Sequence, residues 1–597
     1  MANVFDHLQD AIFRSARFPE PVKVLRIDDV DGTYYTLHAV GVDSGKHYSP
    51  ILTGDELETM SRDRRGKTIL DGNTANFRLA TEAYRIRLAY LYDPLFAVSV
   101  SKIDPLPHQL EAVYEYMLPQ PALRFMLADD PGAGKTIMGG LLLKELKLRG
   151  VLARTLIVVP SPLRTQWKRE MREKFDEHFD IVERATLNAL GPARTWGMTH
   201  QAIVSIDFVK QPDVLDSLAV AEMWDIIIVD EAHKMAAYRR SPTKVERSQR
   251  YRLGEILSER AERLLLMTAT PHKGDPENFR FLLSLVDADL FADQQILQRA
   301  VERHENPIFL RRLKEDMRRF DGKPLFPPRY TKTVSYELEG AEWDLYRRVT
   351  HYVETNFNRA LSDENRNVTF ALIVLQRRLA SSVRAIRRSL ENRRTRLVEL
   401  RDDVLRDPHL LEAARRDRLD IPDGDEDLTE DERWQLEQNA LRFTVARNID
   451  ELNHEIQQLE ELIVLAEQAE GEQPERKLRE LEGVMRELNV QNTAEKLLIF
   501  TEAKDTLDYL VENLQAWNFT VITIHGEMQQ PDREAAEATF KSDKAQVMIA
   551  TEAAGEGINL QFCHLMVNYD VPWNPTRLEQ RLGRIHRYGQ DREVFRK

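Results

Sequence analysis

Apolar residues along this chain gather in short uninterrupted runs that are separated by stretches of helical spacing. Between residues 102 and about 330 the runs are "LRFMLA", "TLIVVP", "QAIVSI", "WDIIIVD" and "RLLLMTAT". Continuous apolar strands between helices are typical of a parallel sheet that is covered on both faces. A second block of this kind starts near residue 495, with "KLLIFTEA", "TVITIHG", "AQVMIAT" and "HLMVNYD". The pattern therefore predicts two α/β lobes.

Two other regions have different patterns. Near the N-terminus, "VKVLRI", "YYTLHAVGV" and "KHYSPILT" are strand-like and are separated by turns, which predicts a small β-rich module followed by the helical "ATEAYRIRLAYLY". The region between the two α/β blocks has coiled-coil spacing in two helices. Its seam positions are Leu390, Leu397, Leu400 and Val404, and then Ile449, Leu452, Ile456, Leu459, Ile463 and Ala466.

Two antiparallel helices joined through the acidic "IPDGDEDLTEDE" would form a projecting arm. The predicted fold class is thus α/β, with two parallel-sheet lobes, a helical insertion and an N-terminal β-rich module. The predicted domains are the module at 1–100, the first lobe at 101–336, the helical arm at 337–490 and the second lobe at 491–597.

Composition narrows the class of protein. With 597 residues, of which 42% are hydrophobic and 30% charged, the chain is long enough for about three or four globular domains. A net charge of −14 argues against uniform coating of nucleic acid but allows a local basic groove. The one cysteine, Cys563, excludes an intrachain disulfide, and no apolar run reaches the ~18 residues of a membrane span. We expect a cytoplasmic protein without a membrane partner.

The segment "LRFMLADDPGAGKTIMGGLLLKEL" has the pattern of a strand, a glycine-rich loop and a helix. Gly132 and Gly134 permit a backbone whose N–H groups converge, with those of the helix N-terminus, on an anion. Lys135 would then reach the β- and γ-phosphates of ATP, and Thr136 would bind Mg²⁺. The full loop pattern has a first glycine where this chain has Asp129, so the match is incomplete. An ordinary glycine-rich turn is the alternative.

Two adjacent acids supply the chemistry that such a loop needs. Asp230 and Glu231 follow the strand "WDIIIV", at the edge where open parallel sheets bind ligands. Hydrolysis of ATP requires a carboxylate that holds the metal and a group that orients water. Asp230 suits the first role and Glu231 the second, with Lys135 as the third catalytic residue. A helix N-cap is the alternative interpretation of this acid pair.

Two stretches are rich in arginine. "RLEQRLGRIHRYGQ", residues 577–590, places Arg577, Arg581, Arg584 and Arg587 on one helical face, and a solvated basic face is one interpretation of it. "QRRLASSVRAIRRSLENRRTR", residues 376–396, contains eight arginines and one glutamate. Such a patch suits DNA phosphates, whereas charge pairing with the acidic end of the arm is the alternative. The DNA-binding candidates in it are Arg387, Arg388, Arg393 and Arg394.

Eight motifs, in order, resemble those of helicase superfamily two and cover about residues 105–590. They are "ADDPGAGKT", "LIVVPSPLRTQW", "DEAH", "LLLMTATP", "LIFTEAKDTLDYL", "IHGEM", "ATEAAGEGINLQFCHLMVNYDVPWNP" and "QRLGRIHRYGQ". The ending "WNP…QRLGRIHRYGQ" resembles the Swi/Snf branch of double-stranded DNA translocases.

The resemblance implies that both lobes are RecA-like and that the first lobe, 101–336, binds ATP. It also implies roles for individual residues. Arg584 and Arg587 match arginine fingers that act on ATP bound by the other lobe, and Gln580 matches a nucleotide-sensing position. Gln109 matches a glutamine that reads adenine. Further nucleotide contacts are implied for Gly555 and Gly557. A link between the ATP and DNA sites is implied for Thr268 and Thr270, and contacts to a DNA strand are implied for Ser161, Gln166, Ser205, Thr501 and Thr551.

These features predict an ATP- and Mg²⁺-dependent translocase that steps along duplex DNA without reading bases. Within the motor class, the alternatives are a strand-separating helicase and an RNA-polymerase-recycling ATPase. A third alternative, from another class, is a nucleotide-gated scaffold that hydrolyses ATP negligibly. The layout is also similar to that of helicases in bacterial anti-phage defence.

Two further expectations concern partners and the C-terminus. The N-terminal module and the helical arm are the expected surfaces for protein partners. The chain ends at "DREVFRK", just past the last motif, where members of the resembling family continue with a strand and a helix. We therefore expect an unpaired sheet edge there and a chain that is cut short.

Overall fold

The computed structural model describes residues 5, 8–15, 17–62, 74–88, 93–235, 237–241, 244–269, 276–288, 308–362, 365–417, 430–493, 495–552, 558–572 and 574–596. The chain forms two compact units, Met1–Leu88 and Ala89–Lys597. Among the described residues, no helix is both long and apolar enough to cross a bilayer.

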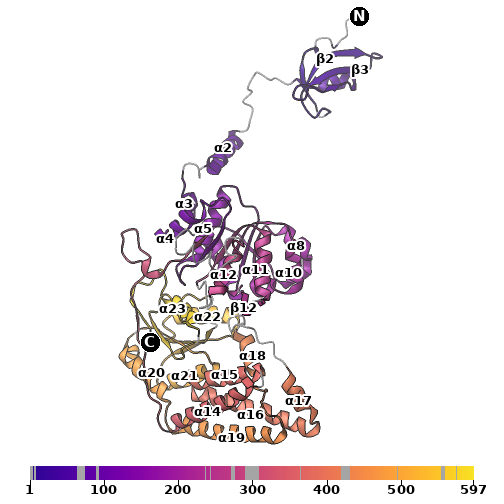
Figure 1. Cartoon of the computed structure of the whole chain (residues 1–597). Coiled ribbons are helices and arrows are strands. Elements are labelled where there is room, and N and C mark those ends of the chain that lie inside the picture. The colour runs from indigo at the N-terminus through magenta and orange to yellow at the C-terminus, as the bar shows by residue number, and fades with distance from the viewer. Residues whose placement is uncertain are drawn as a thin grey trace. The chain divides into compact units, whose positions relative to one another are not determined.

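The unit Met1–Leu88 is built around an antiparallel sheet with strand order β4-β3-β2-β1-β6, in which β5 also pairs with β3 (Figure 1). Alternate side chains of the two long strands, such as Val22, Val24 and Leu37, are buried in one apolar core. The predicted β-rich module is confirmed. Its elements are β1 (Ile12–Arg14), β2 (Val22–Asp29), β3 (Tyr34–Gly41), β4 (His47–Tyr48), β5 (Ile51–Thr53), α1 (Gly54–Thr59), β6 (Ser61–Arg62) and α2 (Thr74–Leu88).

The first lobe contains a parallel sheet with order β15-β7-β14-β11-β8-β10-β9. Leu156 and Val158 belong to one apolar cluster and Ile157 and Val159 to another, so both faces of the sheet are buried. This two-sided burial explains the uninterrupted apolar runs. The strands are β7 (Arg124–Leu127), β8 (Thr155–Val159), β9 (Asp180–Ile181), β10 (Gln201–Ser205), β11 (Trp224–Val229), β14 (Ala261–Met267) and β15 (Phe309–Leu310).

Helices cover this sheet, and a hairpin that the sequence did not predict, β12 (Ala237–Ser241) with β13 (Lys244–Arg247), follows the acid pair. A π-helix at Glu111–Met117 continues α4. The α-helices are α3 (Phe96–Val100), α4 (Pro107–Leu110), α5 (Lys135–Leu148), α6 (Arg164–Phe175), α7 (Arg184–Leu190), α8 (Pro192–Met198), α9 (Ile206–Val209), α10 (Pro212–Ala219), α11 (Gln249–Arg260) and α12 (Pro276–Ser284).

The second lobe has its own parallel sheet, with order β16-β21-β20-β17-β19-β18. Apolar clusters again lie on both of its faces. The two predicted parallel-sheet lobes are therefore confirmed. The elements are β16 (Arg329–Thr331), β17 (Leu497–Phe500), α21 (Lys504–Ala516), β18 (Val521–Ile524), α22 (Gln530–Lys541), β19 (Val547–Ala550), β20 (Leu565–Asn568), α23 (Pro575–Ile585) and β21 (Val594–Arg596).

Strand pairing and packing correct two predicted boundaries. β16, which precedes the helical insertion, pairs with β21, and β21 pairs on its other side with β20. Residues 329–331 were predicted in the first lobe but lie in the sheet of the second, and the expected unpaired edge at "REVFRK" is wrong. Similarly, α3 was predicted in the N-terminal module but packs on the first lobe, where the N–H of Ala97 donates to Glu145 Oε2 at 3.1 Å.

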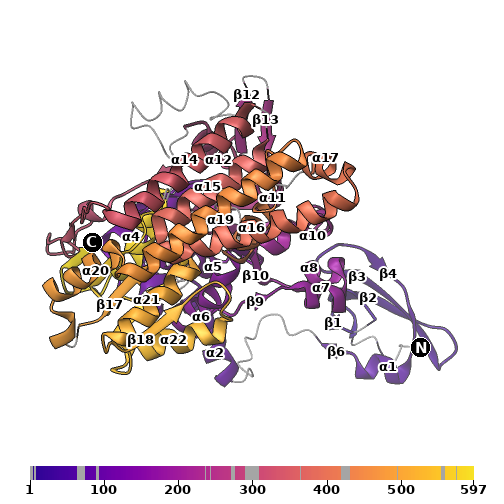
Figure 2. The same cartoon turned by 90° about the horizontal axis from the view of Figure 1, so that it is seen from below.

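The insertion is a bundle of long helices that share one apolar core (Figure 2). The predicted seam is present, since Leu390 on α16 and Leu459 on α19 are buried in that core. The two helices belong to the bundle rather than to a separate projecting arm. Residues 418–429, most of the predicted acidic connection, lie outside the described residues. The helices are α14 (Gly340–Ser362), α15 (Arg366–Ser381), α16 (Val383–Arg406), α17 (His409–Arg416), α18 (Glu430–Ala440) and α19 (Ile449–Glu472). α20 (Arg476–Glu487) was predicted in the insertion as well, but its apolar residues, such as Leu478, pack in the core of the second lobe.

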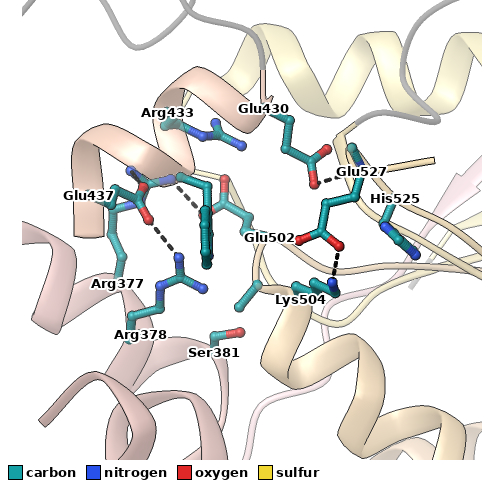
Figure 3. A pocket seen from close by; sticks show the side chains of 13 residues that line it. Arg377, Arg378, Ser381, Glu430, Arg433, Glu437, Glu502, Lys504, His525 and Glu527 are labelled. Atoms are coloured by element: carbon teal, nitrogen blue, oxygen red, sulfur yellow. Dashed lines mark hydrogen bonds and ion pairs between the residues drawn. The ribbon is translucent and has the colours of Figure 1, made fainter. Parts of the chain in front are cut away.

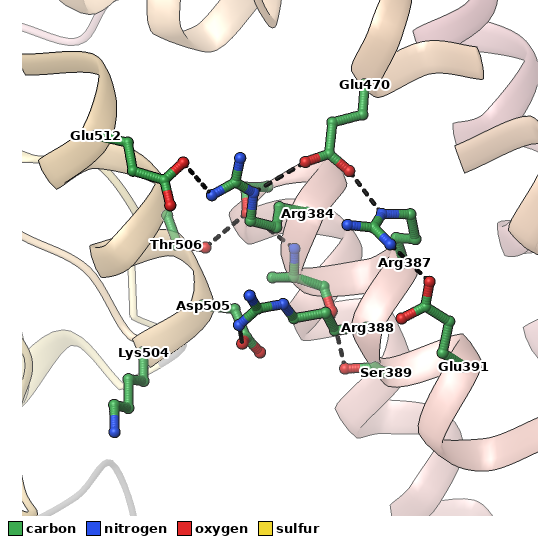
Figure 4. Close-up of polar contacts among 12 residues, drawn as sticks. Arg384, Arg387, Arg388, Ser389, Glu391, Glu470, Lys504, Asp505, Thr506 and Glu512 are labelled. Carbon is green, nitrogen blue, oxygen red and sulfur yellow. Dashed lines mark hydrogen bonds and ion pairs between the residues drawn. The ribbon is translucent and has the colours of Figure 1, made fainter. Parts of the chain in front are cut away.

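Charged contacts fix the bundle to the second lobe (Figure 4). Arg384 of α16 donates to Glu470 of α19 at 2.8 Å and to Glu512 of α21 at 2.6 Å. One turn later, Arg388 pairs with Asp505 of α21 at 2.6 Å. The insertion therefore has a defined position on the lobe that follows it in sequence.

Candidate nucleotide site and nucleic-acid interface

The glycine-rich loop lies between β7 and α5 and has the backbone that its sequence predicts. Gly132 and Gly134 have φ of 85° and 88°, in the left-handed region that favours glycine. α5 begins at Lys135, whose Nζ donates to the carbonyl oxygens of Asp129 at 2.7 Å and Asp130 at 3.2 Å. The amine thus points back over the loop, where it is placed to meet phosphate.

Asp129, which replaces the first glycine of the pattern, has a structural role. Its buried carboxylate accepts from Arg312 Nη2 at 2.6 Å and from the N–H of Arg312 at 3.1 Å. Arg312 also donates to Glu111 at 2.8 Å. The incomplete match is therefore explained by an anchor that ties the loop to the segment following β15.

Gln109 lies against the same loop, as the resemblance implied. A Cβ placed on Gly134 would lie 2.5 Å from Gln109 Nε2, so the glycine leaves room for this amide. Gln109 Oε1 is buried and has no hydrogen-bond partner among the described residues. A buried acceptor without a partner is costly, and it fits a base that donates to it when ATP is bound. The residues around the loop thus fit a nucleotide.

The acid pair lies at the end of β11. Asp230 accepts from Trp167 Nε1 at 3.0 Å and, through its other oxygen, from the N–H of Glu231 at 2.9 Å. Burial and the neighbouring Glu231 raise the pKa of Asp230 to about 6. Burial opposes ionisation of Glu231 as well, but the contact with His233 keeps its pKa below the usual range. The geometry fits a metal ligand beside an ionised acid.

A short polar chain leads from the acid pair to β14. His233 Nδ1 lies 3.3 Å from Glu231 Oε2 and 3.0 Å from Thr268 Oγ1. Thr268 follows β14 and is buried. Thr270, its predicted companion, lies outside the described residues, as do Gly555 and Gly557. The structure thus connects the acid pair to Thr268, and a role of Thr268 in a link to the DNA site stays a prediction.

The second lobe reaches the phosphate loop through α23 and the residues after it. A Cβ on Gly132 would lie 3.0 Å from Arg587 Cγ and 3.2 Å from the carbonyl oxygen of His586. Burial lowers the pKa of the Arg587 guanidinium, and among the described residues no carboxylate is ion-paired with it. Lys314, between the lobes, donates through Nζ to the same His586 carbonyl. A partly desolvated cation thus lies beside the loop where phosphate is expected.

Two other arginines of this motif, Arg577 and Arg581, have structural contacts, so the interpretation as a solvated face is wrong for these two. Arg581 is buried and donates to Glu552 Oε1 at 2.6 Å, and Arg577 lies 3.5 Å from Glu502. Burial would raise the pKa of Glu552, but Arg581, then Arg577 and Arg433, bring it to about 2. Arg584 and the half-buried Gln580 lie on α23, and their roles stay predictions.

The predicted DNA contacts have mixed outcomes. Ser205 caps α9, accepting from the N–H of Phe208 at 3.1 Å, and Thr501 donates to Asp570 at 2.6 Å. Both side chains are buried and have structural contacts here, and their DNA contacts stay predictions. Ser161, just before α6, and Gln166, on α6, are half-buried, and their roles stay predictions. Thr551 is buried but donates to a residue from outside the lobe, Glu430 of α18, at 2.9 Å.

The basic stretch on α16 mostly pairs with carboxylates. Arg393 has no exposed surface and binds Glu455 at 2.7 Å, so its predicted DNA contact is wrong. The three other candidates have acidic partners: Arg387 with Glu470 and Glu391, Arg388 with Asp505, and Arg394 with Glu460. Pairing with acids, the alternative interpretation, describes this stretch, and DNA binding by the three other arginines stays a prediction.

Sequence reasoning missed Arg312, Lys314 and α18. Arg312 and Lys314 lie in "RRLKED", a stretch without a distinctive pattern. Arg312 contacts the phosphate loop, and Lys314 contacts the second lobe. The first residues of α18 fall in the acidic segment that was predicted only to join the two helices of the arm. The sequence pointed to a helix here only through the spacing of the charged residues, since Glu430, Arg433 and Glu437 fall on one helical face.

Comparison with known proteins agrees with this architecture. Residues 108–387 match the family of the SNF2-related domain, and residues 477–589 match the helicase conserved C-terminal domain. The uncharacterized ATP-dependent helicase YqhH of Bacillus subtilis (strain 168) is 29% identical over 541 residues, covering 88% of this chain and 81% of YqhH. RNA polymerase-associated protein RapA of Vibrio cholerae (serotype O1, strain M66-2) is 27% identical over 544 residues, covering 88% of this chain and 50% of RapA.

The chain therefore spans about half the length of RapA. Among solved structures, the SWI2/SNF2 ATPase core of Sulfolobus solfataricus in complex with double-stranded DNA aligns with 83% of this chain and 88% of its own, at 16% identity and a TM-score of 0.34, too low to carry an argument. The lobes, the loop and the family matches define an ATP hydrolase of the helicase class. The chain belongs to the SNF2-type proteins of helicase superfamily two.

Proposed function

We propose that this protein is an ATP- and Mg²⁺-dependent motor that translocates along duplex DNA. The observation that carries the proposal is the approach of Arg587, from the second lobe, to Gly132 in the phosphate loop of the first. An arginine that completes the site only when the lobes meet couples ATP turnover to lobe movement. A nucleotide-gated scaffold would not need this contact.

Each residue of the site has a distinct part in the proposed reaction. The loop N–H groups and Lys135 hold the phosphates. Thr136 and Asp230 would hold Mg²⁺, which would neutralise part of the phosphate charge. Glu231 orients the attacking water and accepts its proton. Arg587, with Arg584, stabilises charge that develops on the γ-phosphate. Gln109 supplies the acceptor for the base.

The ATPase assignment is tested by two variants with different expected signatures. Glu231→Gln should retain ATP binding and lose turnover, because only proton transfer and water orientation are removed. Arg587→Ala should lower kcat by about 10³-fold or more with little change in ATP affinity. Arg592→Ala, an exposed arginine that pairs with Glu495 at 2.6 Å, is the matched control. Normal turnover by Arg587→Ala would refute the finger role.

Translocation without strand separation is supported by the second lobe. Unstacking bases costs a few kcal/mol per step and needs a rigid wedge. Between β17 and β21 the described residues form strands and helices in which all strand pairing is parallel, without a hairpin. ATP should therefore displace the third strand of a triplex and leave a forked duplex paired. Fork unwinding without triplex displacement would favour the helicase alternative.

The match to RapA supports a second candidate, recycling of RNA polymerase. A physical association with the polymerase would be its minimum requirement. Co-migration of the purified chain with core RNA polymerase in gel filtration, with release of polymerase from a stalled complex on addition of ATP, would favour this candidate. Duplex-stimulated ATPase activity without polymerase binding would favour a general translocase.

A further inference from the structure

The carboxyl edge of the second sheet is covered by a helix from the insertion. β17, β18 and β19 are parallel neighbours that end at Phe500, Ile524 and Ala550. Ligands of open parallel sheets bind at this edge. In this structure α18 lies there, and its side chains line a pocket together with residues that follow β17 and β18 (Figure 3).

Glu430, the first residue of α18, binds two donors at this edge. Its Oε2 accepts from the hydroxyl of Thr551, which follows β19, at 2.9 Å. Its Oε1 accepts from the backbone N–H of Gly526, which follows β18, at 3.3 Å. Hydroxyl groups and backbone N–H groups are the donors that proteins commonly present to nucleic-acid phosphates. The carboxylate therefore occupies a small anion site that two strand ends create.

Charged contacts hold the part of α18 that lines this pocket. Glu437 accepts from Arg378 at 2.6 Å and from Arg377 at 3.4 Å. Arg377 also lies 3.6 Å from Glu502, after β17. At the pocket the residues that α18 buries, Arg433 and Glu437, are charged, whereas its buried apolar residue, Ala440, lies at the far end of the helix, outside the pocket. An interface of this kind can be exchanged for phosphate without exposing an apolar surface.

Little space is left while α18 is in place. The pocket between α18 and the strand ends has a cavity volume of about 40 Å³, room for one or two water molecules. A nucleotide strand cannot enter a space of that size. Access to the donors on Gly526 and Thr551 thus requires that α18 move away.

We propose that α18 is a built-in competitor of nucleic acid, with the Glu430 carboxylate in the position of a backbone phosphate. The inference rests on the proposed function, because it assumes that a DNA strand is what the second lobe binds. Duplex DNA then engages this edge only as α18 leaves it. While α18 covers this edge, the motor cannot bind duplex DNA there. The measured affinity for duplex DNA is therefore reduced by the free energy needed to detach the helix.

The test compares Glu430→Gln with Glu432→Gln in the full chain. Both changes remove one negative charge from the same helix, but Glu432 is exposed and does not line the pocket. Glu430→Gln should bind a blunt duplex about tenfold more tightly at fixed salt, since the charge-assisted contacts are weakened. Glu432→Gln should stay within about twofold of wild type. Thermal unfolding of each variant confirms that the fold is intact.

A double-mutant cycle assigns the effect to the anion site. In a Thr551→Val background the gain from Glu430→Gln should shrink to less than about threefold, because carboxylate and phosphate lose the same donor. Hydrogen exchange adds a direct readout: duplex DNA should speed amide exchange in α18 of the wild-type chain.

The outcomes separate this inference from the proposed function. If wild type and Glu430→Gln bind duplex equally and exchange in α18 does not change, the competitor role is wrong while DNA binding stands. If no variant binds duplex at low salt, both proposals fail. Tighter binding by Glu430→Gln, with faster exchange in α18, supports both.

Discussion

A Cβ placed on Gly583 would lie 2.6 Å from the Cβ of Pro131, which makes this glycine the point where the last helix of the second lobe meets the phosphate loop of the first. Real Cβ atoms do not approach that closely, so any larger residue must push the two lobes apart. The same contact brings Arg587 to Gly132. The lobe interface is thus specified by glycines on both sides.

This contact predicts that Gly583→Ala lowers ATP turnover. The added methyl group separates α23 from the loop, so kcat should fall at least ~10-fold while ATP affinity, set mainly by the first lobe, changes little. Gly483→Ala on α20 is the control, because nothing lies within 4 Å of its added Cβ. That variant should be as active as wild type and slightly more stable. Equal turnover by both variants would contradict the proposed role of lobe contact.

The hydrogen bond from Trp167 to Asp230 gives a second prediction. Trp167→Phe keeps an aromatic ring in the core but removes the only N–H of the side chain, so Asp230 loses a buried donor. The carboxylate should then be less well oriented, and the Mg²⁺ concentration for half-maximal ATPase activity should rise by about tenfold. Titration of Mg²⁺ at saturating ATP measures this. An unchanged Mg²⁺ requirement would mean that the bond serves packing alone.

The sequence predicted those parts of the site that depend on local pattern. The loop glycines, Lys135 and the acid pair each follow a buried strand, so their neighbours in sequence determine where they lie. The role of Asp129 depends on Arg312, about 180 residues later, and could not be read locally. The pairing of β16 with β21 was hidden for the same reason, because a short polar strand gains its place from a distant partner.

For the arginine-rich helix α16, the sequence could not predict which arginines are buried. Composition makes Arg387, Arg388, Arg393 and Arg394 equivalent, yet Arg393 is buried and Arg394 is half-exposed. Which one faces inward depends on the rotation of α16 against α14 and α19. The buried partners of Arg393, Tyr352 and Glu455, lie on α14 and α19 respectively. Only the packed bundle reveals this difference.

That difference predicts unequal effects on stability. Arg393→Gln leaves Glu455 buried without its cation and should cost about 3–5 kcal/mol. Arg394→Gln breaks a surface pair with Glu460 and should cost about 1 kcal/mol or less. Chemical denaturation followed by circular dichroism measures both. If Arg393→Gln instead leaves stability unchanged and flattens the salt dependence of DNA binding, the original DNA-binding interpretation would be restored.

The last prediction concerns pH and Glu475, the residue before α20. Its side chain is buried, and its Oε1 accepts from the N–H of Val383 at 2.6 Å. Burial raises the pKa of this carboxyl from 4.5 to about 7, although the hydrogen bond from Val383 opposes the shift. The folded chain therefore holds a proton here that the unfolded chain has already released at neutral pH.

The sign of the effect follows from this difference. Stability linked to the protonated carboxyl is fully present below about pH 4.5 and is lost as pH rises through about 7, with a total on the order of 3 kcal/mol. Glu475→Gln can still accept from Val383 but has no proton to lose. Its unfolding midpoint should therefore exceed that of wild type by a few degrees at pH 8 and match it near pH 5. Glu467→Gln, an exposed change on α19, should differ little from wild type at either pH. A midpoint difference that is the same at pH 5 and pH 8 would show that Glu475 is ionised in the folded chain throughout.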